Sequence, residues 1–231
     1  MTQDLVFAAG EGDRWFARNR SALADPDRVA RDPILRVLEL IALTPKDALE
    51  IGAANGYRLA ALARRSGCRT TAVEISEDAI RDGRERYPAI EFLSGLASDL
   101  PVESGRQFDL VIVSFVLHWV DRSTLLRSAA EIDRVVRPLG HLVIADFLPA
   151  APERVAYHHL PGAGVWTYKQ DYTEIFLATR LYERGALVTY EAESRAWAVD
   201  VDLAHRCAVS VLRKVADEGY RTTRFAASEP R

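Results

Sequence analysis

Residues 48–56, ALEIGAANG, combine a short apolar segment with a turn of small residues, and such a combination can hold a nucleoside. Residues 48–51 are typical of a buried strand, and the turn 52–56 follows directly. Gly52 and Gly56 can adopt positive φ angles and let the backbone approach a ligand with no side chain between them. The turn is therefore a candidate site for a ligand that is bound through main-chain contacts.

An acid at the end of the next predicted strand supplies a second part of this site. A helical segment over residues 57–65 follows the turn, and the segment TAVEIS at 71–76 places Glu74 at the tip of a second strand. A carboxylate in this position can accept hydrogen bonds from both hydroxyls of a ribose. The strand, turn, helix and second strand thus predict a βαβ unit that binds a nucleoside.

The residue order within the turn distinguishes between nucleoside cofactors. A dinucleotide site requires G-x-G-x-x-G, whereas Gly52, Ala54 and Tyr57 occupy those positions here. With Glu50 included, residues 50–56 instead resemble motif I (E/D-x-G-x-G-x-G) of the class I S-adenosylmethionine (SAM) methyltransferases, with Ala54 in place of the middle glycine. On this motif alone, a tight strand–helix turn of an unrelated α/β protein remains an alternative.

Further segments in the same order extend the resemblance over about residues 35–150 and 186–215. They match the family's GDA-x-x-LP element, its FD-[LV]-V strand, its LHWV-like segment, its E-x-x-RV-L-[KR]-PGG helix end and its seventh strand. In that order, the segments are GLASDLP (95–101), FDLV (108–111), LHWV (117–120), EIDRVVRPLG (131–140) and RCAVSVLRK (206–214).

Two departures from the family pattern affect the expected site. Leu96 stands where an acid often meets the adenine amino group, so we expect adenine to be bound by the backbone of Leu96 and Ala97, with help from Ser98 or Asp99. One glycine of the PGG turn is replaced by Leu139. We interpret the first change as a variation in adenine binding and the second as structural.

The resemblance implies SAM as cofactor and S-adenosylhomocysteine (SAH) as product. It also implies which residues contact the cofactor. Trp119 flanks the adenine or packs in the core, while Trp15 and Arg18 reach the methionine end or the acceptor, or belong to an amphipathic surface helix. The predicted cofactor residues are Glu50, Gly52, Ala53, Asn55, Gly56, Glu74, Ile75, Leu96, Ala97, Ser98, Ser114, Trp119, Trp15 and Arg18.

The alternation of predicted strands and helices indicates a parallel sheet with right-handed crossovers. The strands centre on Leu49, Val73, Phe92, Val111 and Val143. The resemblance implies an α/β Rossmann-like class I methyltransferase fold: a mostly parallel seven-stranded sheet with an antiparallel last strand and helices on both faces.

The chain divides into four predicted parts within one domain, 1–231. Residues 1–32 form an N-terminal helical lid, with a helix from about residue 13 to 23. Residues 33–148 are the cofactor half, 149–180 are an insertion that covers the substrate, and 181–215 supply the last two strands.

Composition agrees with a single enzyme domain and argues against some classes of binding partner. The chain has 231 residues, 48% of them hydrophobic, and a net charge of -3, which argues against binding nucleic acid through its phosphates. No apolar run approaches a membrane span, and the first residues lack the features of a signal peptide. We expect a cytoplasmic monomer or homodimer without membrane or nucleic-acid partners, with Cys68 and Cys207 reduced.

His118 directly follows the fourth strand, where ligands of open α/β sheets bind. Methyl transfer from a sulfonium depends mainly on orientation, and a general base is needed only for a hydroxyl or a protonated amine. His118 is the predicted catalytic residue in that role; the alternative is a residue that shapes the site. Arg58, just after the glycine turn, meets the SAM carboxylate or lies on an exposed helix face.

Two polar and aromatic clusters in the insertion are the predicted acceptor site, because loops on a rigid scaffold often carry binding residues. Neighbouring histidines point in different directions and make poor joint metal ligands, so no metal site is expected. Lys169 is suited to a carboxylate or phosphate of the acceptor. The predicted acceptor residues are Tyr157, His158, His159, Tyr168, Lys169 and Tyr172.

These features together predict a SAM-dependent methyltransferase that acts on oxygen or nitrogen of a small polar metabolite. The segment 10–19 and the two clusters of the insertion more loosely resemble methyltransferases of sugar-nucleotide and nonulosonic-acid pathways, which favours a sugar-derived or secondary metabolite. Two alternatives remain: a nucleotide-dependent oxidoreductase, and a SAM-binding protein without catalysis.

Overall fold

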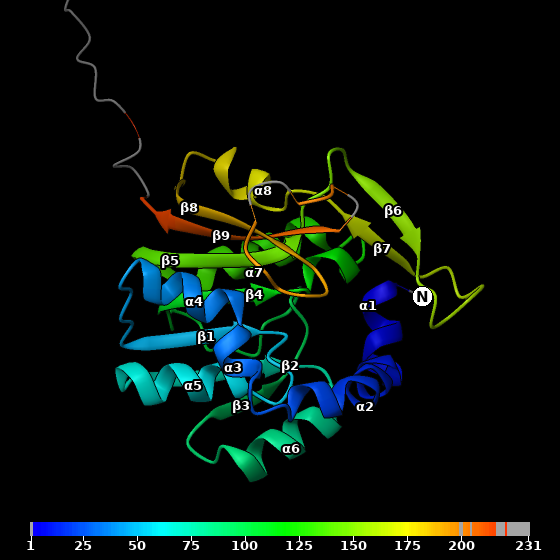
Figure 1. Cartoon of the computed structure of the whole chain (residues 1–231), viewed down its shortest axis with the longest axis horizontal. Coiled ribbons are helices and arrows are strands. Elements are labelled where there is room, and N and C mark those ends of the chain that lie inside the picture. Colours follow the sequence, from blue (N-terminus) through cyan, green and yellow to red (C-terminus); the bar gives the residue numbers. More distant parts are fainter. Residues whose placement is uncertain (1, 199–200, 204, 216–219, 221–231) are drawn as a thin grey trace, which may run out of the picture.

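The computed structural model describes residues 2–198, 201–203, 205–215 and 220, so the predicted domain 1–231 extends beyond the described residues. A seven-stranded sheet in the order β3-β2-β1-β4-β5-β9-β8 forms its centre (Figure 1). β9 is antiparallel to its neighbours β5 and β8, and the pairs among β1 to β5 are parallel. The predicted fold is confirmed. The strands of this sheet are β1 (Asp47–Ile51), β2 (Arg69–Glu74), β3 (Glu91–Ser94), β4 (Phe108–Ser114), β5 (Val136–Phe147), β8 (Tyr182–Glu191) and β9 (Arg206–Lys214).

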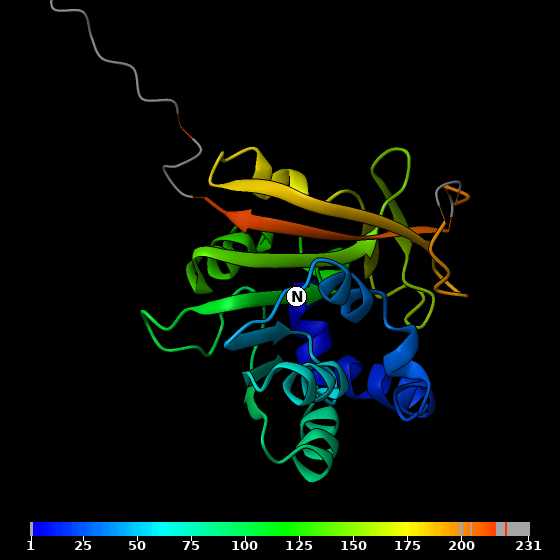
Figure 2. The same ribbon diagram turned by 60° about the vertical axis from the view of Figure 1, so that its left-hand side comes forward.

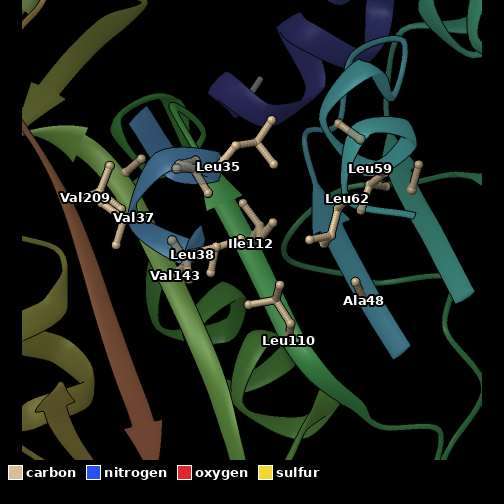
Figure 3. Close-up of a cluster of buried hydrophobic side chains, with 14 of the residues drawn as sticks. Leu35, Val37, Leu38, Ala48, Leu59, Leu62, Leu110, Ile112, Val143 and Val209 are labelled. Atoms are coloured by element: carbon tan, nitrogen blue, oxygen red, sulfur yellow. The ribbon is translucent and has the colours of Figure 1, made fainter. Parts of the chain in front are cut away.

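Helices cover both faces of the sheet. α4 and α5 pack on one face, where their leucines meet the apolar residues of the strands (Figure 3), and α7 and α8 pack on the other. Figure 2 shows β8 at one edge of the sheet, with β9 between it and β5. The helices are α1 (Gln3–Val6), η1 (Phe7–Glu11), α2 (Gly12–Leu23), α3 (Arg28–Arg31), α4 (Pro33–Leu40), α5 (Tyr57–Ser66), α6 (Glu77–Arg86), η2 (Leu117–Trp119), α7 (Leu125–Val135) and α8 (Thr173–Leu177).

Local sequence explains where the central elements begin and end. The strands β1 and β4 are almost entirely buried because helices cover both of their faces, and their sequences are mostly apolar, with Glu50 a buried exception in β1. Asp32 caps α4 by accepting hydrogen bonds from the backbone N–H groups of Ile34 and Leu35, both at 3.0 Å, and Pro33 fits the first turn. Ser76 caps α6 through Ala79.

The N-terminal segment is helical from Gln3 onward, ten residues earlier than expected, and Gly10 bends it with a φ of 122°. The side chain of Gln3 donates to the carbonyls of Trp119 (2.7 Å) and Trp166 (2.8 Å). Asp13 accepts a hydrogen bond from the Ser76 hydroxyl at 2.7 Å. The segment is therefore fixed across the carboxyl ends of the parallel strands, on the right in Figure 1.

The insertion 149–180 contains regular structure. Its strands β6 (Glu153–Ala156) and β7 (Trp166–Lys169) form a separate two-stranded antiparallel sheet, and α8 follows. β6 is exposed and β7 is half-buried. The insertion thus pairs with itself, outside the central sheet.

Leu139 has a φ of 62°, at the position where the family pattern has a glycine. A side chain in this left-handed region is strained by about 1–2 kcal/mol, and Leu139 is exposed, so little packing is lost with its side chain. Leu139→Gly should raise the free energy of unfolding by up to about 1 kcal/mol in urea denaturation. Leu139→Ala keeps the Cβ and should give no gain; equal effects of the two would show that the backbone is unstrained.

Candidate active site

A cavity of about 430 Å³ lies at the carboxyl ends of the parallel strands, within the range of roughly 300–1,000 Å³ that is usual for small-molecule sites. Its walls come from the ends of β1, β2, β4 and β5, from the N-terminal helices and from the turn after β8. The cavity brings the glycine turn, Glu74 and His118 together in one space.

The glycine turn depends on the absence of a side chain at Gly52. Gly52 has a φ of +71°, and a Cβ there would lie 2.2 Å from the Cγ2 of Val116. Gly56 has a φ of +77°, and its Cβ would lie 2.8 Å from the Cζ of Phe92. Gly52 lines the cavity, so its backbone is open to a ligand.

Substitution of Gly52 by alanine should be costly, and Gly67 provides a matched control. Gly67 has the same φ of +71°, but no atom lies within 4 Å of the position that a Cβ would occupy there. Gly67→Ala should therefore lose only about 1 kcal/mol from backbone strain, whereas overpacking against Val116 adds about 1–3 kcal/mol for Gly52→Ala. Urea denaturation measures both. Equal losses would show that the turn can move away from Val116.

Glu74 is held rigidly beside the turn. Its Oε2 accepts a hydrogen bond from Ala54 N (2.7 Å), and its Oε1 accepts from Ile75 N (2.8 Å) and Ser76 N (3.0 Å). Burial raises the pKa of Glu74, and the three backbone N–H groups act against that rise. A carboxylate has about four acceptor positions, so at least one remains for a hydroxyl in the cavity that Glu74 lines.

Glu50 and Arg58 form a buried cluster below the turn. Arg58 bonds to Glu50 Oε1, to Asp32 Oδ2 (3.1 Å from Nε) and to the Tyr57 hydroxyl (3.0 Å). Arg58 is therefore buried, so of its two predicted alternatives the exposed helix face is wrong; contact with the SAM carboxylate stays a prediction, and Arg58 lines the cavity. Burial raises the pKa of Glu50 to about 7 although Arg58 lowers it, and Glu50 Oε2 is buried with no hydrogen-bond partner among the described residues.

These observations test whether a SAM-like group fits the cavity. The open backbone at Gly52, the acceptor position of Glu74 and the unpartnered Oε2 of Glu50 all face or border the same space. They suit a ligand that carries sugar hydroxyls and a positively charged ammonium, because carboxylate oxygens only accept hydrogen bonds. The residues fit the cofactor.

His118 is buried in η2, directly after β4, and lines the cavity. Its Nδ1 lies 2.9 Å from Asp146 Oδ1, and the same oxygen accepts the backbone N–H of Phe147 at 2.8 Å. When Nδ1 carries the proton, Nε2 is the free base, and within the described part of the chain no hydrogen bond engages it. This is the arrangement of a general base oriented by a carboxylate.

Asp146 was not among the predicted site residues. It lies near the end of β5, and the pairing of Ser114 with Ala145 puts the ends of β4 and β5 side by side. The sequence offered one signal for Asp146: it is an acid near the end of the strand next to β4, and His118 follows β4. Only the strand register shows that these two side chains meet.

An aromatic wall joins the N-terminal segment to His118. The Trp119 ring stacks on Phe7 with centroids 5.0 Å apart and contacts the His118 ring at 4.4 Å. Trp15 packs edge-on against Trp119 at 6.4 Å, and Trp119 Nε1 donates to Thr167 Oγ1 at 3.1 Å. The wall thus fixes Trp119 beside the predicted base.

Most residues that were predicted to bind the cofactor line the cavity. Asn55, Gly56 and Arg18 do not: Asn55 bonds to Asp82 at 2.9 Å, and Arg18 pairs with Glu11 at 2.5 Å. The lining includes Glu50, Gly52, Ala53, Glu74, Ile75, Leu96, Ala97, Ser98, Ser114, Trp119 and Trp15.

The six residues predicted to bind the acceptor do not line the cavity: Tyr157, His158, His159, Tyr168, Lys169 and Tyr172. The Tyr157 hydroxyl is held by Glu11 (2.8 Å) and Arg18 (2.9 Å). Tyr172 is buried with its hydroxyl on the Tyr168 carbonyl (2.7 Å), and Lys169 pairs with Glu153 (3.1 Å). His158 and His159 are exposed. These side chains contact one another, the N-terminal segment and residues that follow β4 or end β5: Arg122 lies over the Tyr168 ring at 4.2 Å, and Lys169 Nζ lies over the Phe147 ring at 5.1 Å.

Five further residues that line the cavity were not predicted from the sequence: Phe115, Phe147, Tyr190, Arg28 and Arg195. They come from segments far apart in the chain, without a motif. Among the residues with described positions, no group of three or more metal-binding side chains is close enough to hold an ion. None of the described helices is long and apolar enough to span a membrane.

Comparison with known proteins agrees with this geometry. Residues 49–144 match the family described as "Methyltransferase domain". A demethylmenaquinone methyltransferase of Beutenbergia cavernae is 35% identical over 47% of this chain and 45% of its own length, so the chain spans about half the length of this relative.

Two solved structures share the fold over most of the chain. The 1,6-didemethyltoxoflavin-N1-methyltransferase of Burkholderia thailandensis superposes with a TM-score of 0.67 at 20% identity, covering 91% of this chain and 90% of its own. The N-methyltransferase NodS of Bradyrhizobium japonicum gives 0.58 at 20% identity, covering 86% and 97%. Both contain SAH. Residues 49–144 are thus similar to a methyltransferase domain, and the chain shares the fold of these two SAH-containing methyltransferases.

Proposed function

We propose that the protein transfers the methyl group of SAM to an oxygen or nitrogen of a small molecule. The observation that carries the proposal is the shared cavity that joins the glycine turn and Glu74 to the His118–Asp146 pair. The first two features suit the nucleoside, and the pair suits removal of a proton from the acceptor. A nucleoside site and a base in one space are what such a transfer requires.

Each residue has a distinct role in this proposal. Glu74 holds the ribose, the Gly52 turn lies against the nucleoside through its backbone, and Glu50 receives the ammonium of the methionine part. When bound, SAM supplies a methyl group on a sulfonium, and the S–C bonding pair stays on sulfur to give SAH. His118 Nε2 takes the proton of the acceptor as the new O–C or N–C bond forms, while Asp146 holds the imidazole in position.

The N-terminal segment is proposed as the lid of this site. Phe7 and Trp15 line the cavity, and Gln3 and Asp13 bond to the ends of other elements. A cover of this kind excludes water from the reacting atoms. The insertion 149–180 supports the lid, through the bond of Tyr157 to Glu11, and this is its proposed role here.

The names of similar proteins include acceptors other than the sugar-derived or secondary metabolite expected from the sequence. They include methyltransferases for demethylmenaquinone, for phthiotriol dimycocerosates, for malonyl-[acyl-carrier protein] and for a didemethyltoxoflavin. The sugar-derived acceptor suggested by the sequence stays a hypothesis, and it depended on side chains that do not line the cavity.

Methyl transfer from SAM with a labelled methyl group tests the proposal. Incubation of the purified protein with labelled SAM and a panel of hydroxyl- and amine-bearing small molecules should give a labelled product and SAH. SAH binding without transfer to any acceptor would favour the non-catalytic SAM-binding protein. Binding of a nicotinamide nucleotide in place of SAH would favour the oxidoreductase.

A further inference from the structure

The cavity extends across the sheet beyond the proposed cofactor residues. Strand order places β3, β2 and β1 on one side and β4, β5, β9 and β8 on the other. The proposed nucleoside contacts belong to the first side. The second side of the cavity, over β4, β5 and β8, is therefore left for the acceptor.

The acceptor side is walled by aromatic rings. The rings of Phe115 and Phe147 are 5.3 Å apart at 85°, and the His118 ring lies 5.1 Å from Phe147. Cys207 of β9 pairs with both Phe147 and Tyr190, so Tyr190 is two strands from Phe147 along the same edge. Such rings favour a flat apolar body, because aromatic pairs gain from offset or edge contacts.

One cation borders this aromatic space without a partner of its own. Arg195 lines the cavity, and in the described ranges no hydrogen bond or ion pair of its side chain occurs within 4.0 Å. Its attraction for Asp32 is felt only at longer range, and Asp32 is already bonded to Tyr57 (2.6 Å) and Arg58 (3.1 Å). The guanidinium of Arg195 is thus available to a ligand.

The position of Arg195 is set by its backbone. It follows β8 in a turn closed by its own N–H to the Glu191 carbonyl (2.9 Å) and by Glu191 N to the Ala196 carbonyl (3.1 Å). Its φ of 58° is unusual for a residue other than glycine. Strained residues of this kind are often found at ligand sites.

A second arginine adds positive charge to the cavity, next to the helix that follows β1. Arg28 lines the same cavity, and its guanidinium lies 4.6 Å from the centre of the Tyr57 ring. Its Nε is buried and has no hydrogen-bond partner among the described residues. Among the carboxylates around the cavity, Asp146 is bonded to His118 and Asp32 to Arg58, while Glu50 Oε2 has no hydrogen-bond partner among the described residues.

We propose that the acceptor is an aromatic compound with a carboxylate, its ring between Phe115, Phe147 and Tyr190 and its carboxylate on Arg195. This inference rests on the proposed methyltransferase function and names the substrate class of that site. A planar guanidinium matches a carboxylate with two parallel hydrogen bonds. The hydroxyl or amine that is methylated would then project from the ring toward His118.

Binding to the SAH-loaded protein tests the inference separately from catalysis. The probes are 6-hydroxy-2-naphthoate and its neutral amide, each titrated by calorimetry into protein saturated with SAH. Because a hydrogen bond to a charged group contributes about 1.5–3 kcal/mol, the acid should bind about 10–100-fold more tightly than the amide. Arg195→Gln should remove that preference and leave the affinity for the amide within about twofold.

Matched variants separate this role from a structural one. Arg213→Gln, at an exposed position on β9 outside the cavity lining, should leave the preference unchanged. Arg195→Lys keeps the charge but loses the planar fork, so it should retain part of the preference. Thermal unfolding of each variant shows whether it is folded.

Methyl glucoside, titrated in the same way, serves as a sugar probe. Three outcomes would overturn the inference while SAH still binds: equal affinity for the acid and the amide, an unchanged preference for the acid in Arg195→Gln, or binding of methyl glucoside but of neither naphthalene compound. Absence of SAH binding would instead reject the proposed function itself, and with it this assignment. The two failures are thus distinguishable in the same titration series.

Discussion

Replacement of His118 by alanine should lower the turnover of methyl transfer by about 10²–10⁴-fold, the usual contribution of a general base. The affinity for SAH should change by less than about threefold, because the proposed nucleoside contacts lie on the other side of the cavity. Asp146→Asn should also lower turnover, since an amide in place of the carboxylate can favour the wrong imidazole tautomer. Initial rates with labelled SAM and calorimetry with SAH measure the two quantities.

His141 gives a matched control for this prediction. It lies on β5 as Asp146 does, but it does not line the cavity. His141→Ala should leave turnover within about twofold of the wild type. Unchanged turnover in His118→Ala would remove the base from the mechanism and leave His118 with a role in shaping the site.

Glu74→Gln should weaken SAH binding by about 5–10-fold, because it replaces a charge-assisted hydrogen bond, which contributes about 1.5–3 kcal/mol, by a neutral one of about 0.5–1.5 kcal/mol. The amide nitrogen would also face one of the three backbone N–H groups that now donate to the carboxylate. Turnover at saturating SAM should fall far less than affinity. Calorimetry with SAH and rates over a range of SAM concentrations separate the two effects.

Glu77 is the control acid for this experiment. It lies three residues further along the chain, in the first turn of α6, bonds to Ser94 Oγ at 2.8 Å and does not line the cavity. Glu77→Gln should bind SAH as the wild type does. If both variants bound SAH equally well, Glu74 would have a structural role alone.

The sheet and its nucleoside edge could be predicted because the signals are local. β1 and β4 are covered on both faces, so their sequences are mostly apolar, with Glu50 as a buried acid in β1 and Asp109 near the start of β4. A glycine turn and an acid at the next strand end follow at fixed spacing. His118 was predictable for the same reason, as it follows β4 within a few residues.

The acceptor side could not be predicted because it is assembled from distant segments. Asp146 meets His118 only through the register of β4 and β5, and Arg195 comes from a turn some eighty residues beyond His118 in the chain. Neither stands in a recognisable motif. The clusters around Tyr157 and Tyr168 are dense in polar and aromatic residues, but their bonds to Glu11, Arg18 and Tyr172 use those groups in support of the fold.

The remaining difference between the predicted and the observed structure lies in the backbone of the N-terminal segment and of the insertion. The bend at Gly10 joins two helical pieces into a segment that crosses the strand ends, and a glycine alone does not indicate such a bend. The strands β6 and β7 have four residues each; β6 shows no alternation of apolar and polar residues, and the alternation in β7 is too short to identify a strand. The hairpin of β6 and β7 and the path of the N-terminal segment therefore could not be predicted from the sequence.

A crystal structure of the protein with SAH tests the central claim most directly. We expect the adenosyl group in the cavity beside the Gly52 turn, with a ribose hydroxyl at hydrogen-bond distance, about 2.5–3.0 Å, from the Glu74 carboxylate. A nucleoside bound away from Glu74, or SAH outside this cavity, would contradict it.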